Sequence, residues 1–349
     1  MGTTKELSPN QQAWIRFRRN TAAVAGCAVI FLLILVALLG SSIRPDTSEN
    51  ANQQNLSISR QKPGFSVDIL TIPPLTKGGR EISSKQEFPL ASYRVEGETL
   101  FMVPFGDELE TAFELNGLVV EDIVKERTYW LGTDKYGRDL LSRLMAGTRI
   151  SISVGFIAVL ISLLVGIALG AMAGYFGGKV DAVVSWLINV IWSIPTLLMV
   201  IAITLAFGKG FWQVFIAIGL TMWVEVARIV RGQFLSIREK EYVEAAKALG
   251  YSHTRIILKH ILPNAWGPII VISAANFAGA ILVEAGLSFL GIGAQIPTPS
   301  WGNMIKEHYA MITTDLAYLA ILPGLLIMLL VLSFMMVGNG LRDALDVRS

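Results

Sequence analysis

The stretch EYVEAAKALGYSHTRIILKHILPN, residues 241–264, decides how the rest of the chain is organised. It is basic and lies between two strongly apolar runs. Apolar side chains recur in its first half at helical spacing, which predicts a short helix with one apolar face. An apolar face between two membrane spans lies outside the bilayer and therefore needs a partner. The residues of this expected face are Tyr242, Ala245, Ala246 and Leu249.

The second half of the stretch predicts a turn followed by another short helix. Gly250 suits the left-handed conformation that ends a helix, because it has no Cβ. Ser252 suits the N-cap of the next helix, where its hydroxyl accepts a backbone N–H. This second helix is expected to stop before Pro263. The stretch 241–264 is thus predicted to be a helix–glycine–helix elbow.

The composition indicates a membrane protein. Of the 349 residues, 53% are hydrophobic and only 16% are charged, against about 25% charged in an ordinary soluble chain. The net charge of +2 gives no general argument for nucleic acid. The single Cys27 excludes a disulfide within one chain and a cysteine-based metal framework.

Six apolar runs are long enough to cross a bilayer as helices. The first, Ala22 to Leu39, is longer than the apolar part of a cleaved signal peptide, so an uncleaved anchor is expected. Pro195 is expected to kink the third span. Gly166, Gly170 and Gly174 form a small-residue stripe that favours close helix packing in lipid. The later spans are expected at about 152–173, 184–206, 212–230, 268–290 and 318–338.

The segment between the first two spans is too long for a simple connection. A hairpin is expected over Tyr93 to Val103, turning at Glu96 to Glu98, and a helix over Leu115 to Glu126. Residues 44–130 therefore predict a small mixed α/β insert, and residues 131–151 an amphipathic helix on the membrane face. Asp134 and Asp139, within that second segment, lack the spacing of a calcium loop, and capping is the simpler role.

The charges of the short connections predict the orientation. Basic residues gather in the N-terminal tail, residues 1–20, and in the central loop, residues 237–264, so both are expected in the cytoplasm. Six spans return the C-terminal tail, residues 339–349, to the same side. The insert is then extracytoplasmic, because long loops escape the rule of positive charge inside.

Four motifs resemble the permeases of ABC importers, and in particular the C-type membrane subunit of oligopeptide and dipeptide systems. The elbow resembles their EAA loop through Glu244, Ala245, Ala246, Gly250, Leu262 and Pro263. His260 departs from the general pattern, which has isoleucine there. The other matches are LGTDKYGRDLLSRLMAGTRIS at 131–151, GYFGGKVD at 174–181, and EAGLSFLGIG through PTPSWG at 284–302.

The resemblance implies an all-α polytopic membrane protein with six transmembrane helices and the type I ABC-importer permease fold. The first transmembrane helix is expected at 21–43 and a five-helix permease domain at 152–338. It implies a second permease subunit, two cytoplasmic ATPase subunits that hold ATP and Mg²⁺, and an external substrate-binding protein. The elbow would dock on an ATPase. The implied function is uptake of oligopeptides or dipeptides across the cytoplasmic (inner) membrane. Nickel or another small solute remains open as the substrate, and an ion-coupled secondary transporter or a scaffold remains open as the class.

The residues themselves carry no enzyme motif, and the three histidines form no ligand cluster, so no cofactor and no metal are expected on this chain. Glu244 either contacts the ATPase or pairs with Lys247 or Lys240 on a solvated helix. Glu284 lies in a span and either lines or gates a pathway or forms a structural pair. Asn189 and Asn276 are further candidates of that kind, with interhelical hydrogen bonding as the alternative.

Overall fold

The computed structural model describes residues 9–72, 76–77, 80–81, 86–208, 210–293, 295 and 297–345. Lys209 and both extreme tails, residues 1–8 and 346–349, lie outside these ranges. The described chain forms two compact units. We call residues 1–38, 147–307 and 322–349 the helical unit, and residues 39–146 and 308–321 the sheet unit.

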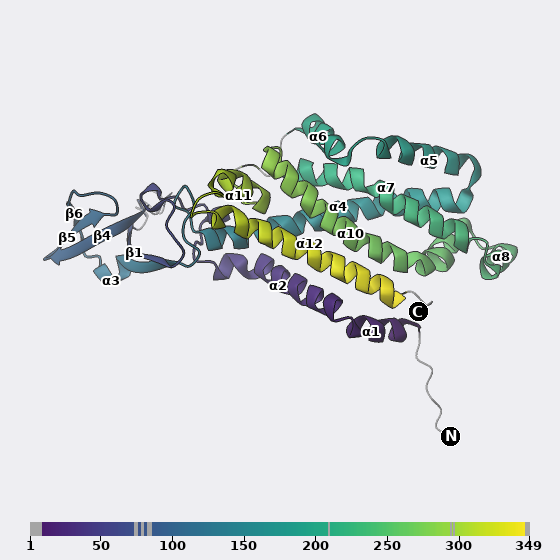
Figure 1. Ribbon diagram of the computed structural model, residues 1–349, viewed down its shortest axis with the longest axis horizontal. Coiled ribbons are helices and arrows are strands. Elements are labelled where there is room, and N and C mark those ends of the chain that lie inside the picture. The colour runs from purple at the N-terminus through teal and green to yellow at the C-terminus, as the bar shows by residue number, and fades with distance from the viewer. Residues whose placement is uncertain are drawn as a thin grey trace, which may run out of the picture. The chain divides into compact units, whose positions relative to one another are not determined.

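The helical unit is built from apolar helices whose lengths match a bilayer (Figure 1). Five of them pass as single spans, and a sixth span is made if the bent pair α5 and α6 is counted as one. This confirms a polytopic helical membrane protein. The single spans are α2 (Thr21–Ile43), α4 (Leu140–Phe176), α7 (Phe211–Ile237), α10 (Leu262–Leu290, extended back to His253 by shorter turns) and α12 (Tyr318–Leu345).

The third span is broken rather than gently kinked. Helix α5 (Gly178–Trp192) and helix α6 (Thr196–Phe207) meet at 93°. Pro195 stands as the N-cap of α6, where its missing N–H costs nothing. The predicted effect of this proline is therefore confirmed, and its size exceeds a kink.

The glycine stripe of α4 packs against α7. A Cβ on Gly166 would lie 2.5 Å from the Val226 Cβ, and one on Gly170 would lie 2.5 Å from the Ala227 carbonyl oxygen. A Cβ on Gly174 would likewise meet the Phe234 side chain at 2.5 Å. The three glycines therefore let the two helices approach backbone to backbone, as predicted.

The sheet unit contains a five-stranded antiparallel sheet in the order β6-β5-β4-β1-β7. The predicted hairpin is confirmed, with Glu96 opposite Thr99 at its turn. The predicted helix over 115–126 is mostly wrong, because only α3 (Val120–Ile123) is helical and the next six residues pair with β1. The strands are β1 (Phe65–Ile72), β4 (Gln86–Glu96), β5 (Thr99–Pro104), β6 (Thr111–Glu114) and β7 (Val124–Tyr129), with a separate hairpin of β2 (Thr76–Lys77) and β3 (Arg80–Glu81).

The sequence predicted a separate surface helix at 131–151, and this is wrong. Residues from Leu140 onward begin the long helix α4. Two of the three arginines of this stretch are buried, Arg138 at 1% and Arg143 at 2% exposure, whereas Arg149 is exposed. Further short helices include α1 (Pro9–Arg19) and α11 (Trp301–His308).

Candidate functional site: the elbow and a cavity at the broken span

Helix α8 (Glu241–Ala248) forms the first half of the elbow and ends as predicted. Gly250 has a φ of +75°. Its N–H donates to the Lys247 carbonyl at 3.0 Å, and the Tyr251 N–H donates to the Ala246 carbonyl at 3.2 Å. These two bonds make a Schellman motif, which fixes the direction in which the chain leaves α8.

The second half of the elbow differs from the prediction. Helix α9 (His253–Ile256) starts at Ser252, whose hydroxyl accepts the Arg255 N–H at 3.4 Å. It does not stop before Pro263 but continues into α10 through the wide turn Ile257–Ile261. The wide turn relieves the clash that the ring of Pro263 would cause inside a regular helix.

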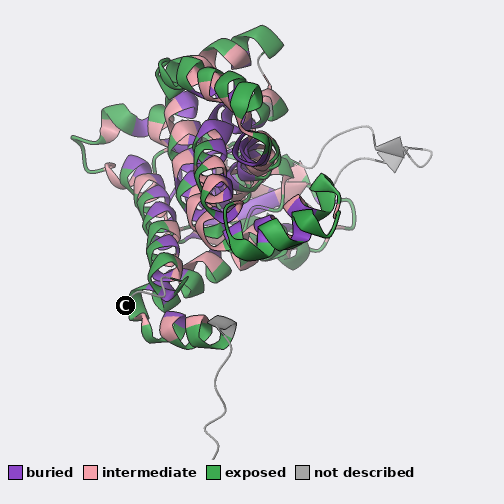
Figure 2. Cartoon of the chain, turned by 90° about the vertical axis from the view of Figure 1, so that its right-hand side faces the viewer, coloured by how far each residue is buried: buried purple, intermediate pink, exposed green. Residues whose placement is uncertain are grey.

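The apolar face of α8 is divided between the chain's own core and the surface. Val243 and Ala246 are buried, at 0% and 4% exposure, in a core cluster with Tyr175 and Phe234. Tyr242 is 45% exposed and Leu249 is 71% exposed. The predicted face of four residues is therefore split, because Ala246 packs inside the chain. Ala245 and Glu244 remain exposed. Figure 2 shows in green that much of the helical unit facing the viewer is exposed.

Aromatic and polar contacts join the elbow to the spans. The Tyr175 hydroxyl lies 2.8 Å from His253 Nδ1, which joins α4 to α9. Arg238, at the end of α7, donates to the Gly174 carbonyl at 3.1 Å. His260, which departs from the family pattern, stacks on Tyr251 with ring centroids 5.8 Å apart. A movement of α8 would therefore reach several spans directly.

The sequence candidates for a pathway do not come together. Glu284 is 1% exposed and accepts a hydrogen bond from the Ser288 hydroxyl at 2.6 Å. Asn276 is also 1% exposed, and its amide donates to the Met222 carbonyl at 3.4 Å. Both contacts fit the structural roles held open for these residues. Asn189 is exposed on α5, away from any such contact in the described residues.

Trp301 is the first residue of α11. It is fully buried, and a Cβ on Gly147 would lie 2.7 Å from its ring. The neighbouring Gly302 packs on α10, where a Cβ would lie 2.5 Å from the Ala285 carbonyl oxygen. The motif at 297–302 therefore seats α11 against α10 within the helical unit.

A cavity of about 210 Å³ lies at the break between α5 and α6. Its walls come from both of these helices and from α7 and α10. Glu225 is the one ionisable side chain among its described lining residues. Sequence reasoning missed this residue, although an acid within the apolar run of α7 was a signal in the printed sequence.

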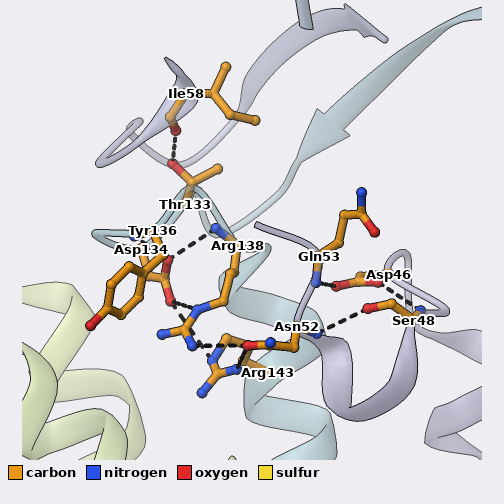
Figure 3. Close-up of polar contacts among 10 residues, drawn as sticks. All are labelled: Asp46, Ser48, Asn52, Gln53, Ile58, Thr133, Asp134, Tyr136, Arg138 and Arg143. Atoms are coloured by element: carbon orange, nitrogen blue, oxygen red, sulfur yellow. Dashed lines mark hydrogen bonds and ion pairs between the residues drawn. The ribbon is translucent and has the colours of Figure 1, made fainter. Parts of the chain in front are cut away.

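The sheet unit holds a buried polar cluster that we call the clamp (Figure 3). Asp134 accepts hydrogen bonds from the backbone N–H groups of Tyr136 at 2.8 Å and Arg138 at 3.0 Å, and from Arg138 Nε at 2.5 Å. Arg138 and Arg143 both reach Asn52 Oδ1, at 3.2 and 3.5 Å. The clamp therefore ties the segment before α4 to the segment after α2.

Backbone capping completes the clamp. The Thr133 hydroxyl donates to the Ile58 carbonyl at 2.5 Å, and Asp46 accepts the N–H groups of Ser48 and Gln53 at 2.8 and 3.0 Å. Asp139 accepts the Ser142 N–H at 2.8 Å at the start of α4. Burial raises the pKa of the Asp139 carboxyl, against the hydrogen bonds from Ser142. The capping role expected for Asp134 and Asp139 is confirmed.

Models of known protein families match most of this chain. Residues 166–348 match the family model described as "Binding-protein-dependent transport system inner membrane component". Residues 8–63 match the "N-terminal TM domain of oligopeptide transport permease C".

Individual relatives agree with the family models. The dipeptide transport system permease protein DppC of Bacillus subtilis is 33% identical over 97% of this chain and 86% of its own length. DppC of Alkalihalophilus pseudofirmus is 43% identical over 62% of this chain and 71% of its own length. A solved structure of the MetNI methionine ABC transporter in an inward-facing conformation shares the fold, with a TM-score of 0.50 and 18% identity, over 59% of this chain and 98% of that chain.

Proposed function

Because the chain belongs to the family of binding-protein-dependent transport system inner membrane components, we propose that it is one of two membrane subunits of an ATP-driven importer of dipeptides or oligopeptides. A second permease, two cytoplasmic ATPases and an external binding protein complete the proposed assembly. ATP and Mg²⁺ are bound on the ATPases, and this chain is non-catalytic. Relatives named for dipeptide and oligopeptide transport support the substrate class.

The proposed location is the cytoplasmic membrane, with both termini and the elbow inside. The basic residues of the elbow support this orientation, since positive charge favours the cytoplasmic side. Within the helical unit, α8 and the C-terminal end of α12 lie at the same end (Figure 1). This arrangement agrees with an even number of spans, α10 and α12, between α8 and the end of α12.

One observation carries the proposed coupling to an ATPase: the exposed apolar side of α8. Leu249 is 71% exposed at the tip of a helix outside the membrane spans. The adjoining side of the same helix is buried through Val243 and Ala246. A helix that is held on one side and keeps apolar side chains exposed beside it suits docking in a groove of a partner. In the proposed cycle, ATP binding moves the ATPases, and the Tyr175–His253 contact and the continuous α9–α10 run carry that motion into the spans.

The test compares two exposed leucines. Leu249→Glu is expected to lower recovery of the ATPase with the tagged permease, and ATP-driven uptake, by at least about tenfold, because a charge would be placed in an apolar contact. Leu109→Glu is the matched control, since Leu109 is 73% exposed in the sheet unit. Equal ATPase recovery and uptake in the two variants would reject docking through α8.

We further propose that the five-stranded sheet contacts the external binding protein. Its β4–β5 hairpin exposes Tyr93 and Val95, at 42% and 46%. Phe65 and Tyr129 lie opposite each other, at the start of the first strand and the end of the last strand of the sheet. Residues 66–128 can therefore be replaced by a short glycine turn that leaves the clamp in place. Unchanged docking and uptake after this replacement would reject the contact.

A further inference from the structure

The cavity at the broken span has the features of a binding site inside the membrane. Glu225 lies about 14 residues into the 27-residue helix α7, or roughly 21 Å along a helix about 40 Å long. It is therefore near the middle of the span. Its side chain is exposed, in contrast to the fully buried Glu284.

Glu225 forms no ion pair and no side-chain hydrogen bond with any residue that the structure describes. Arg228, one turn further along α7, instead places its guanidinium 3.3 Å from the centroid of the Trp192 ring. An unpaired carboxylate in a span is costly unless water or a ligand reaches it.

The rest of the lining also favours a cation. Helix α5 ends at Trp192 in the cavity wall, and a helix C-terminus carries partial negative charge. Thr196 and Thr221 add two hydroxyl groups to the lining. The volume of about 210 Å³ holds several waters at roughly 30 Å³ each, or the first residue of a peptide.

We propose that this cavity is a cation-binding subsite on the substrate route and that Glu225 receives the ammonium group at the amino terminus of a peptide. That the ligand is a peptide rests on the proposed peptide function. The negative character of the cavity is independent of that function. The break at Pro195 opens the wall, because helix α6 turns away by 93° just where the cavity lies.

The first test measures charge selectivity without transport. In the assembled transporter, Cys27→Ser removes the chain's one cysteine, and Thr196→Cys places a thiol in the cavity wall. Labelling by a cationic and an anionic methanethiosulfonate reagent is quantified by mass spectrometry on the peptide that contains residue 196. Glu225→Gln is expected to lower the cationic-to-anionic rate ratio about tenfold, and Glu225→Asp to retain it.

Glu239→Gln is the control, because Glu239 is an exposed acid beyond the end of α7. An unchanged rate ratio in Glu225→Gln would overturn the subsite. So would a complete lack of labelling at residue 196, since the second permease or lipid would then fill the cavity.

The second test measures uptake in proteoliposomes that contain the complete transporter. The ratio of uptake of a free peptide to that of its N-acetylated form is compared between variants, which cancels the preference of the binding protein. Glu225→Gln is expected to lower this ratio about tenfold, as for loss of a charge-assisted hydrogen bond, with Glu239→Gln unchanged. Normal uptake with an unchanged ratio would reject the role of Glu225. No uptake of either peptide by the wild-type transporter would reject the peptide function itself, and the labelling ratio would still report on the cavity.

Discussion

Two basic stretches of this chain place their side chains in opposite ways. In residues 131–151 two arginines point inward, and Arg138 and Arg143 are 1–2% exposed in the clamp. In residues 241–264 some apolar side chains stay outside the core, and Leu249 is 71% exposed. Both stretches read as amphipathic helices in the sequence. The difference is that the first finds its partners within the chain, whereas the second leaves one side without a partner in the described residues.

This difference separates a structural motif from a docking motif. The clamp satisfies its charges through Asp134 and Asn52, so its sequence is explained by folding alone. Folding explains only Val243 and Ala246 in α8. The exposed Tyr242 and Leu249 need another reason, and the one that we propose is contact with a partner subunit.

The largest expected effect is the loss of the clamp's carboxylate. Asp134→Ala removes the carboxylate that forms an ion pair with the fully buried Arg138, and loss of one member of a buried pair typically costs about 3–5 kcal/mol. A large drop is therefore expected in folded yield and in the apparent melting temperature of the protein in detergent. Asp107→Ala, at an exposed acid of the same unit, should change both little. Equal losses in the two variants would show that the clamp contributes nothing special to stability.

The spans could be predicted from the sequence because bilayer thickness imposes long apolar runs. The glycine stripe could be predicted too, since glycines at Gly166, Gly170 and Gly174 have few other uses on one helix face. The 93° bend could not, because a proline shows where a helix breaks but not where the next helix turns. The bend also explains why the cavity was not predicted, because the cavity forms only where four helices meet.

The elbow was predicted only in part. Gly250 could be assigned from its chemistry alone, and the structure places it at a positive φ. Which of Ala245 and Ala246 is buried could not be predicted. The answer depends on how α8 is rotated against Tyr175 and Phe234, and the sequence does not show that rotation. The continuation past Pro263 was missed because a wide turn carries no sequence signature.

The second prediction sharpens which alanine faces the chain. Ala246→Leu forces extra volume into the cluster with Tyr175 and Phe234, and overpacking typically costs about 1–3 kcal/mol. Ala245→Leu is exposed and should stay within about 0.5 kcal/mol of the parent. The apparent melting temperature should fall in the first variant only. A fall confined to Ala245→Leu would mean that α8 is rotated the other way against the core.

The smallest expected effect concerns the turn that aims α8. A Cβ on Gly250 would meet no atom within 4 Å, so any penalty comes from the backbone and amounts to about 1–2 kcal/mol for an ordinary residue in the left-handed region. Gly250→Ala should therefore leave the spans intact and lower the melting temperature less than Ala246→Leu does, but it should speed hydrogen exchange at the amides of residues 250 and 251, whose bonds form the Schellman motif. Gly250→Asn should exchange more slowly than Gly250→Ala, because asparagine tolerates this conformation.

If coupling depends on the direction of α8, ATP-driven uptake should follow the same order, with glycine above asparagine and asparagine above alanine. Uptake that ignores this order while amide exchange obeys it would separate the turn from coupling and leave the exposed side of α8 as the only part of the elbow that the ATPase requires.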